Sequence, residues 1–303
     1  MSMNTTNMHI PSNRVRDIER YFITELDGLY PEGERRMFAT MLFEAFLGWD
    51  RTQLLLHRDD TINQSDLLRF HWAVEDLKRY RPIQHIIGYT EFCGLRINVS
   101  PNVLVPRPET EEMVTLIIQW LESRVDNPST AKLHILDICT GSGCIAIALK
   151  RHFPQAEVTG VDLSAKALDM AKCNALQNDS DIRFRPIDVL NKEQMGLLHG
   201  EYDLIVSNPP YVMERERTTM SHNVLDYDPP MALFVPDDDP LIFYRAIGQF
   251  ASTHLKTKGL LATEINELYG EEVRQLFETM NLDSSLNKDS RDKDRTIFAT
   301  PRG

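Results

Sequence analysis

The spacing of apolar residues changes character near residue 85. Over residues 12–90, apolar side chains recur every three or four positions, as in Val15, Ile18, Phe22 and Leu26, which predicts a small bundle of helices whose stripes face a common core. Around Cys93-Gly94 the period falls to two, which predicts a β-hairpin.

From residue 108 onward, short apolar runs alternate with amphipathic stretches, as expected of an α/β fold with a mostly parallel sheet and helices on both faces. The predicted strands are 133–138, 157–161, 182–185, 202–207, 260–265 and 295–299. The predicted helices are 109–122, 143–152, 164–177, 239–255 and 269–280. The chain is therefore expected to comprise a helical domain at 1–84, a hairpin linker at 85–107 and an α/β domain at 108–303.

A rigid corner follows the strand predicted at 202–207. Its residues are Asn208-Pro209-Pro210-Tyr211, and two prolines cannot donate to a sheet ladder, so the strand must end there. The Asn208 amide oxygen and the Pro209 carbonyl can accept both hydrogens of a planar NH2 group while the Tyr211 ring covers its face. The corner thus favours a site that holds an amide or an exocyclic amine for attack on an electrophile. An ordinary proline-rich turn, in which the asparagine bonds its own backbone, is the plainer alternative.

A glycine turn lies upstream, between a strand that ends near Asp137 and a predicted helix. The turn is Cys139-Thr140-Gly141-Ser142-Gly143, and Asp162 follows nineteen positions after Gly143, at the end of the next strand. Glycines admit a ligand close to the backbone. An acidic residue at about this distance commonly accepts hydrogen bonds from ribose hydroxyls.

The turn lacks the third glycine of a pyrophosphate site and the Gly-Lys-Ser or Gly-Lys-Thr of a triphosphate loop. An acidic Asp137 would repel a phosphate but suit a cation, and S-adenosylmethionine combines a ribose with an ammonium and a sulfonium. Asp188-Val189 and Asn208 end two further strands, so these features converge on the carboxyl edge of one sheet, where open α/β sheets bind ligands. The pattern predicts a nucleoside-dependent methyltransferase, with a generic α/β turn as the alternative.

Composition narrows the class of substrate. The chain of 303 residues has a net charge of -12, and residues 1–90 carry 11 basic and 13 acidic residues, so most of the excess negative charge lies downstream. Proteins that grip a nucleic-acid backbone usually show a basic face, so the balance favours a protein or a small-molecule substrate. Residues 1–11 are polar, without the apolar stretch of a signal peptide, and no apolar run reaches the ~18 residues of a membrane helix. The four cysteines have no metal-like spacing. We therefore expect a cytoplasmic protein without a metal or a membrane.

Eight blocks spread over nearly the whole chain carry a family resemblance. They are Leu54–His57, Pro82–Gly88, Glu91–Leu95, Val103–Glu111, Asp137–Gly143, Asn208–Tyr211, Lys288-Asp289 and Asp294-Arg295. In these blocks the chain resembles the HemK/PrmC family, protein-(glutamine-N5) methyltransferases that act on peptide chain release factors. The block Val103–Glu111 favours release factors over the ribosomal-protein subfamily, whereas the Asn-Pro-Pro-Tyr motif alone also recurs in adenine-N6 methyltransferases.

The resemblance implies a Rossmann-like S-adenosylmethionine-dependent methyltransferase sheet and methylation of the glutamine of a Gly-Gly-Gln motif. The implied cofactor contacts are Asp137, Cys139, Thr140, Gly141, Ser142, Gly143, Asp162, Leu163, Asp188, Val189 and Asn208. The implied catalytic residues are Asn208, Pro209 and Tyr211, and Pro210 joins them in binding substrate. Release factors are the implied partners, with no direct contact to nucleic acid. Arg107 and Glu111 are expected either to fasten the hairpin or to form an ordinary surface ion pair.

The chain departs from the family at three positions. Cys139 and Asn266 stand where glycine is usual, and Val189 stands where some relatives carry an aromatic residue that packs on the adenine. Alternative functions stay open at this point: an N6-adenine methyltransferase on DNA or RNA, a glutamine methyltransferase of a ribosomal protein, or a non-catalytic protein that binds release factors.

Overall fold

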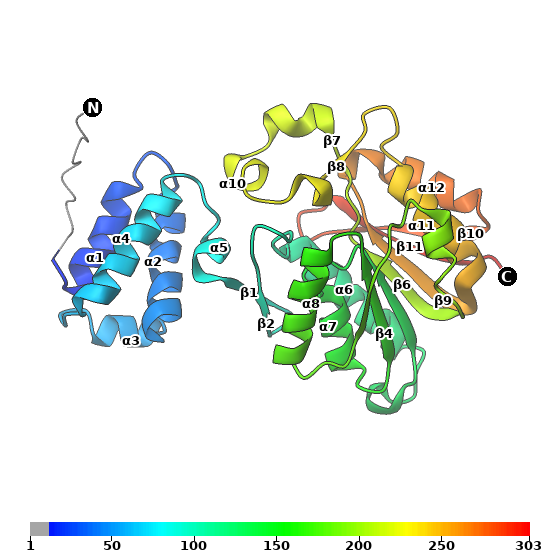
Figure 1. Ribbon diagram of the computed structural model, residues 1–303, viewed down its shortest axis with the longest axis horizontal. Coiled ribbons are helices and arrows are strands. Elements are labelled where there is room, and N and C mark those ends of the chain that lie inside the picture. Colours follow the sequence, from blue (N-terminus) through cyan, green and yellow to red (C-terminus); the bar gives the residue numbers. More distant parts are fainter. Residues whose placement is uncertain (1–11) are drawn as a thin grey trace. The chain divides into compact units, whose positions relative to one another are not determined.

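The computed structural model describes residues 12–303 (Figure 1), and the polar segment 1–11 predicted to lack a signal peptide lies outside them. The chain forms two compact units. One comprises the described residues up to Gly88 together with His222–Tyr227, and the other comprises Tyr89–Ser221 and Asp228–Gly303. The division thus falls after Gly88 rather than at residues 84 and 107, and the hairpin belongs to the second unit.

The first unit is the expected helical bundle. Its helices are α1 (Val15–Glu25), α2 (Glu32–Leu47), α3 (Arg51–Leu56), α4 (Gln64–Leu77), α5 (Ile83–Ile87) and α10 (His222–Leu225). Phe22 and Phe70, which lie on predicted apolar stripes, are buried in its core. Phe43 is buried beside them.

The segment that contains α10 is distant in sequence from the rest of the first unit. Tyr227 donates its hydroxyl hydrogen to the carbonyl of Arg79 at 2.8 Å, and the His222 ring stacks on Tyr80 with ring centroids 5.5 Å apart. The chain therefore leaves the second unit after Ser221 and re-enters it at Asp228.

A seven-stranded sheet in the order β10-β11-β9-β6-β3-β4-β5 forms the centre of the second unit (Figure 1). The strands are β3 (His134–Ile138), β4 (Glu157–Asp162), β5 (Arg183–Pro186), β6 (Tyr202–Ser207), β9 (Leu255–Glu264), β10 (Leu282–Lys288) and β11 (Asp294–Pro301). The five strands from β9 to β5 are parallel, and β11 runs antiparallel to both β9 and β10. This is the predicted mostly parallel sheet.

Helices cover both faces of the sheet, as the alternating pattern predicted. They are α6 (Pro108–Glu122), α7 (Cys144–His152), α8 (Ala165–Gln177), α11 (Ile242–His254) and α12 (Gly270–Glu278), with the single turn α9 (Lys192–Met195) beside them. Apolar residues of α6, α7 and α8 share one core with one face of the strands. Residues of α11 and α12 share a second core with the opposite face. Side chains alternate along each strand, so neighbouring residues such as Leu204 and Ile205 enter different cores.

The hairpin is formed by β1 (Tyr89–Phe92) and β2 (Leu95–Asn98), which pair antiparallel. Its turn residues, Cys93 and Gly94, have φ of 50° and 71°, the left-handed pair that a two-residue hairpin turn requires. The Cys93 backbone nitrogen donates to Glu111 Oε1 at 2.8 Å. Glu111 therefore fastens the hairpin to α6, in agreement with one of the two sequence interpretations.

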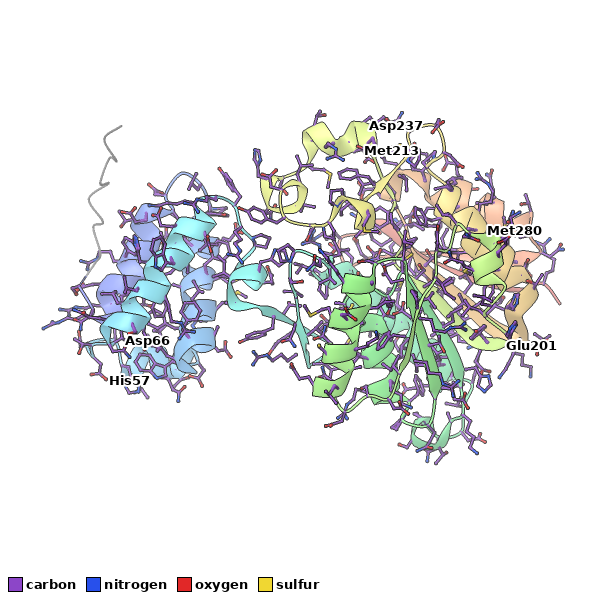
Figure 2. The ribbon with its side chains drawn as sticks, in the orientation of Figure 1. His57, Asp66, Glu201, Met213, Asp237 and Met280 are labelled. Atoms are coloured by element: carbon purple, nitrogen blue, oxygen red, sulfur yellow. The ribbon has the colours of Figure 1, made fainter. Side chains whose placement is uncertain are left out.

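After β6 the chain forms a small parallel pair, β7 (Val212–Met213) with β8 (Phe234–Val235). Figure 2 labels Met213 and Asp237 at this pair, where the Arg215 backbone nitrogen donates to Asp237 Oδ1 at 3.0 Å. Among residues 12–303, no helix is both long and apolar enough to cross a membrane.

Candidate functional site

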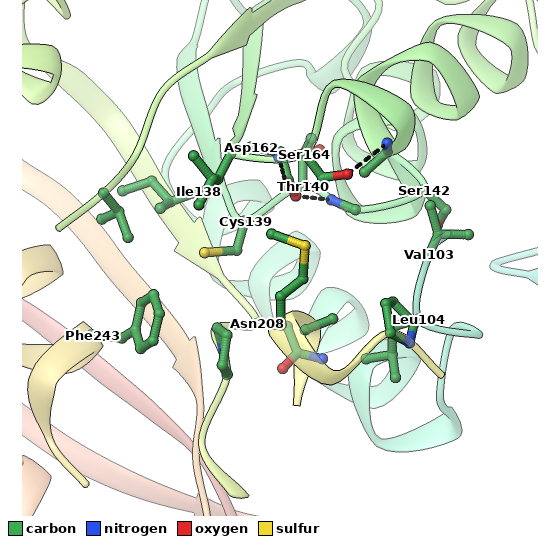
Figure 3. Close-up of a pocket in the computed structure, with 18 of the residues that line it drawn as sticks. Val103, Leu104, Ile138, Cys139, Thr140, Ser142, Asp162, Ser164, Asn208 and Phe243 are labelled. Atoms are coloured by element: carbon green, nitrogen blue, oxygen red, sulfur yellow. Dashed lines mark hydrogen bonds between the residues drawn. The ribbon is translucent and has the colours of Figure 1, made fainter. Parts of the chain in front are cut away.

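A cavity of about 390 Å³ opens beyond the carboxyl ends of the parallel strands in the second unit. This volume lies within the usual range of small-molecule sites, and the position is the one at which open α/β sheets bind ligands. Figure 3 shows Thr140, Asp162, Asn208 and Phe243 around the hollow. These side chains come from four separate parts of the chain.

The glycine turn forms one wall of the cavity. Thr140, Gly141 and Ser142 line it, whereas Gly143 does not. Gly143 has φ of 80°, and a Cβ there would lie 3.1 Å from Ala171 Cβ. The close packing of the turn on α8 and the positive φ therefore favour glycine at position 143, and the cofactor contact expected of Gly143 stays a prediction.

Asp137 lies behind the glycine turn and does not line the cavity, which corrects the prediction of a direct cofactor contact. Its Oδ2 accepts hydrogen bonds from Thr140 Oγ1 at 2.6 Å and from the Ala146 backbone nitrogen at 3.2 Å. The side chain is fully buried, and no group among residues 12–303 forms a hydrogen bond with Oδ1. Burial raises the pKa of Asp137 to about 7, since the two hydrogen bonds only partly offset the desolvation.

Asp162 faces the cavity from the end of β4. Oδ2 accepts a hydrogen bond from the Gly141 nitrogen at 2.9 Å, and Oδ1 accepts one from the Ser164 nitrogen at 2.8 Å. Each carboxylate oxygen has a second lone pair, so the group can still accept hydrogen bonds from two hydroxyls. Burial raises the pKa of Asp162, and the backbone donors oppose that shift. Leu163 lines the cavity beside it.

Asp188 and Val189 line the cavity after β5. Asp188 Oδ1 accepts a hydrogen bond from the Leu190 nitrogen at 2.9 Å, which fixes the loop, and Val189 is buried. Phe243, from the start of α11, lines the same cavity (Figure 3). An aromatic side chain is therefore available to a planar ligand even though position 189 is aliphatic. No sequence pattern marks Phe243, since only the packing of α11 brings it there.

The corner at Asn208 is connected to a buried carboxylate. Asn208 and Pro210 line the cavity, whereas Pro209 and Tyr211 do not. Asn208 Nδ2 donates to Thr110 Oγ1 at 3.1 Å, and Thr110 Oγ1 donates to Glu264 Oε2 at 2.6 Å. The Tyr211 hydroxyl donates to Glu264 Oε1 at 2.9 Å.

The Tyr211 side chain therefore points into the protein interior, where its hydroxyl binds Glu264. Its ring packs against the core shared by α11 and α12. Burial and the neighbouring Glu264 raise the pKa of the Tyr211 hydroxyl well above its usual value. This position differs from the expected one, in which the ring covers a substrate amide in the cavity.

Asn266 supports the same corner from the loop after β9. Its Nδ2 donates to the Tyr211 carbonyl and to Glu216 Oε2, both at 3.2 Å, and its Oδ1 accepts from the Leu268 nitrogen at 3.0 Å. Its φ is -69°, which any residue adopts. The asparagine that stands in place of the usual glycine therefore adds contacts without backbone strain.

Cys139 is the other substitution for glycine, and it lines the cavity. Its φ is 60°, in the left-handed region that costs a non-glycine residue roughly 1–2 kcal/mol. Burial, together with the carboxylates of Asp162 and Asp137, raises the pKa of the Cys139 thiol well above its usual value. The thiol is therefore neutral at physiological pH and acts as a small wall residue.

Arg107 lines the cavity and forms a salt bridge with Asp228. Arg107 therefore holds the segment that follows the Asn208 corner, and it does not pair with Glu111. The Asp228 side chain is fully buried and its Oδ1 lacks a hydrogen-bond partner in the described part of the chain, while Arg107 remains 33% exposed. Burial raises the pKa of Asp228 against the opposing charge of Arg107.

The residues present fit S-adenosylmethionine. Asp162 keeps free lone pairs for ribose hydroxyls, Gly141 has no side chain to fill the adjoining space, and Ile138, Ile187, Val189 and Phe243 give an apolar wall for a base. The carboxylates of Asp162 and Asp188, which line the cavity, also suit a ligand with positive charge.

The fold and the site define an α/β methyltransferase. Residues 114–227 match the model of the methyltransferase small domain, and residues 20–88 match the PrmC N-terminal domain. The release factor glutamine methyltransferase of Flavobacterium psychrophilum is 41% identical over 93% of this chain and 98% of the relative. That of Bacteroides thetaiotaomicron is 40% identical over the same shares. Among solved structures, the ribosomal protein L11 methylase of Lactobacillus delbrueckii subsp. bulgaricus has a TM-score of 0.48 and 18% identity, and covers 69% of this chain and 86% of its own.

The chain belongs to the release factor glutamine methyltransferase family. This confirms the HemK/PrmC resemblance drawn from the sequence blocks.

Proposed function

We propose that this protein transfers a methyl group from S-adenosylmethionine to the side-chain amide nitrogen (N5) of a glutamine in a peptide chain release factor. The names of its relatives support this substrate. The observation that carries the proposal is the orientation of Asn208 at the cavity. Its NH2 group is engaged by Thr110, which leaves Oδ1 as an acceptor for an amide hydrogen of the substrate.

When bound, the cofactor supplies an electrophilic methyl group on a sulfonium. The protein's task is to hold it and to present the amide nitrogen to it. Asp162 would accept hydrogen bonds from the ribose hydroxyls. The glycine turn and the side of the cavity formed by Ile138 and Phe243 would enclose the other parts of the cofactor. Cys139, Thr140, Ser142, Leu163, Asp188 and Val189 complete the lining on this side.

Asn208 Oδ1 would accept one hydrogen of the glutamine amide at the cavity. We propose the carbonyl of the adjacent Pro209, which lies outside the cavity lining, as the acceptor of the second hydrogen. Two acceptors fix the plane of the amide, and their partial negative charges favour positive charge as it develops on the nitrogen. Holding the nitrogen in one orientation supplies much of the rate by proximity. Pro210 lines the cavity beside Asn208 and would contact the substrate side chain.

The proposed partner is a protein, and the acidic balance of the chain agrees with this since it disfavours a grip on nucleic acid. The four cysteines are free thiols. Free thiols are usual in a reducing compartment, so we propose that the protein acts in the cytoplasm.

Methyl transfer from radiolabelled cofactor to purified release factors tests the proposal. The expected result is incorporation into the release factor and a mass gain of one CH2 group on the peptide that bears the target glutamine, read by mass spectrometry. A release factor with that glutamine changed to glutamate should take no label. Equal incorporation into DNA, RNA or a ribosomal protein would favour one of the alternative substrates. Cofactor binding without transfer to any of them would favour a non-catalytic partner.

A further inference from the structure

We propose that Glu264 and Thr110 are positioning residues. They decide whether the Oδ1 atom or the NH2 group of the Asn208 side chain points toward the cavity. The inference rests on the proposed function and deepens it. It concerns the orientation of one side chain, and it can be measured without methyl transfer.

The geometry is a continuous line of hydrogen bonds from the protein interior to the cavity. Glu264 ends β9 and is 2% exposed, and Thr110, in α6, is also 2% exposed. The bond from Thr110 Oγ1 to Glu264 Oε2 measures 2.6 Å, and the bond from Asn208 Nδ2 to Thr110 Oγ1 measures 3.1 Å. The three residues are far apart in sequence, and the fold alone brings them together.

The direction of each hydrogen bond follows from the carboxylate. An ionised Glu264 can only accept, so Thr110 must give its single hydroxyl proton to it. Thr110 Oγ1 then has only lone pairs to offer, so it must accept from the next group. Asn208 can satisfy it only with its NH2 group, which turns Oδ1 toward the cavity. The buried Glu264 carboxylate thus makes Asn208 offer its Oδ1 acceptor, and not its NH2 group, to the substrate.

The same carboxylate holds the other end of the corner. Tyr211 donates to Glu264 Oε1 at 2.9 Å. Both ends of the Asn208–Tyr211 segment are therefore tied to one buried group, and hydrogen bonds in such a network strengthen one another.

The surroundings of Glu264 bear on its ionisation. Burial raises the pKa of Glu264, while the hydrogen bonds from Thr110 and Tyr211 lower it. The titratable groups that face it from the packed elements are Glu109 of α6, Tyr211, Tyr244 of α11 and Arg295 of β11. Arg295 favours the ionised form, although it also binds Glu267 and Asp289.

The plain alternative is a structural role, in which Glu264 only stabilises the fold. The variants Glu264→Gln and Thr110→Val separate the two roles, since both keep the size of the side chain. The glutamine of the first variant has one acceptor and one donor group in place of two acceptors, so it can donate to Thr110 and reverse the polarity of the line. The valine of the second variant offers Asn208 no acceptor. Thr110→Ser keeps the hydroxyl, and Thr115→Val is a matched control on the exposed side of α6.

The first readout is the Asn208 side-chain amide itself. In protein labelled with 15N-asparagine, its NH2 signals are those that vanish in Asn208→Ala. We expect protection of these hydrogens from solvent exchange in wild type, Thr110→Ser and Thr115→Val, and a loss of at least about tenfold (1.4 kcal/mol) in Thr110→Val. Unchanged protection in a folded Thr110→Val would overturn the inference, whatever the substrate of the enzyme proves to be.

The second readout is kinetic. Glu264→Gln and Thr110→Val should lower kcat by about the 10²-fold typical of one lost preorganised contact, while the calorimetric affinity for S-adenosylhomocysteine stays within about twofold. Because the line acts through Asn208, Glu264→Gln should have almost no further effect on kcat in the Asn208→Ala background. A full additional loss in that background would assign Glu264 a structural role and sink the proposal. If wild-type protein methylates no release factor while the amide readout behaves as expected, the proposed function fails and the positioning role stands.

Discussion

Asp162 Oδ2 accepts a hydrogen bond from the backbone nitrogen of Gly141 at 2.9 Å. This bond joins the end of β4 to the glycine turn after β3. The carboxylate expected to hold the ribose therefore also fixes the loop that surrounds the rest of the cofactor. Recognition of one part of the ligand depends on the same group that shapes the wall for another.

Replacement of Asp162 by alanine tests the ribose contact. Asp162→Ala should weaken binding of S-adenosylmethionine by ~1.5–3 kcal/mol, the scale of hydrogen bonds to a charged group. Isothermal titration calorimetry gives the affinity. The control is Asp169→Ala, which removes an exposed carboxylate of α8. An affinity equal to wild type in a folded Asp162→Ala protein would remove Asp162 from the site.

Two substitutions of Asn208 test which part of its side chain catalysis needs. Asn208→Ala should lower kcat by ~10²–10³, as for the loss of one preorganised electrostatic contact, with little change in stability. Asn208→Asp should lose activity as fully. The reason is that a carboxylate oxygen would face Thr110 Oγ1, whose proton is already given to Glu264.

Steady-state kinetics on both Asn208 variants, with cofactor affinity measured separately, checks this result. A purely electrostatic role of the Asn208 oxygen predicts that the aspartate variant keeps much of its activity, since it still has two acceptors. An active Asn208→Asp enzyme would therefore argue against the need for the NH2 group. Near wild-type turnover in Asn208→Ala would reduce the corner to a turn.

The salt bridge between Arg107 and Asp228 should respond unequally to the loss of either partner. Arg107→Met leaves a buried carboxylate without its counter-charge and should lower the free energy of unfolding by about 3–5 kcal/mol. Asp228→Asn should cost less, because the Arg107 guanidinium is partly exposed and can be hydrated. Urea denaturation at pH 6 and pH 8 measures both. The Arg107→Met loss should be larger at pH 8, where an unpaired Asp228 must ionise. Equal losses in the two variants would contradict this.

The raised pKa of Asp137 predicts a contribution to the free energy of unfolding that falls as the pH rises. Burial raises its pKa from 3.8 to about 7 in the folded protein, so the folded state holds a proton that the unfolded state has released. The stabilisation is complete below pH 3.8 and is lost as the pH rises through about 7. Its size is ~1.4 kcal/mol for each tenfold difference in proton affinity.

Asp137→Asn removes this titration and keeps an oxygen for Thr140 and Ala146. The free energy of unfolding of wild type relative to this variant should decrease between pH 5 and pH 8. Chemical denaturation across that range provides the measurement. A difference that stays constant with pH would show that Asp137 remains ionised in its buried site.

The strands and helices around the cavity were predictable because their sequences are strongly patterned. His134–Ile138 and Tyr202–Ser207 are apolar runs bounded by turn residues, and each proved to be a central parallel strand. Leu282–Lys288 was missed. It is an edge strand with Asp, Ser and Asn at most positions, so neither β propensity nor a continuous apolar run marks it.

The site was predictable where chemistry is local and unpredictable where it depends on tertiary contacts. Asp162 ends β4 and Asn208 directly follows β6, and these positions at strand ends place both residues at the cavity. Asp137 was misplaced because its charge was considered without its burial. Thr110 lies in the block Val103–Glu111 and Glu264 in the strand predicted at 260–265, but no pattern relates two residues 154 positions apart.

The segment His222–Tyr227 has a consequence for how this protein can be divided. It belongs to the helical unit although it lies within the sequence of the catalytic one, so the polypeptide passes between the two units three times. A shortened chain that begins at Tyr89 would remove Arg79 and Tyr80, the partners of Tyr227 and His222. Truncation of the chain at one position therefore cannot separate the complete catalytic unit from the complete helical unit. Grafting or swapping the helical unit among relatives must carry both pieces of sequence together.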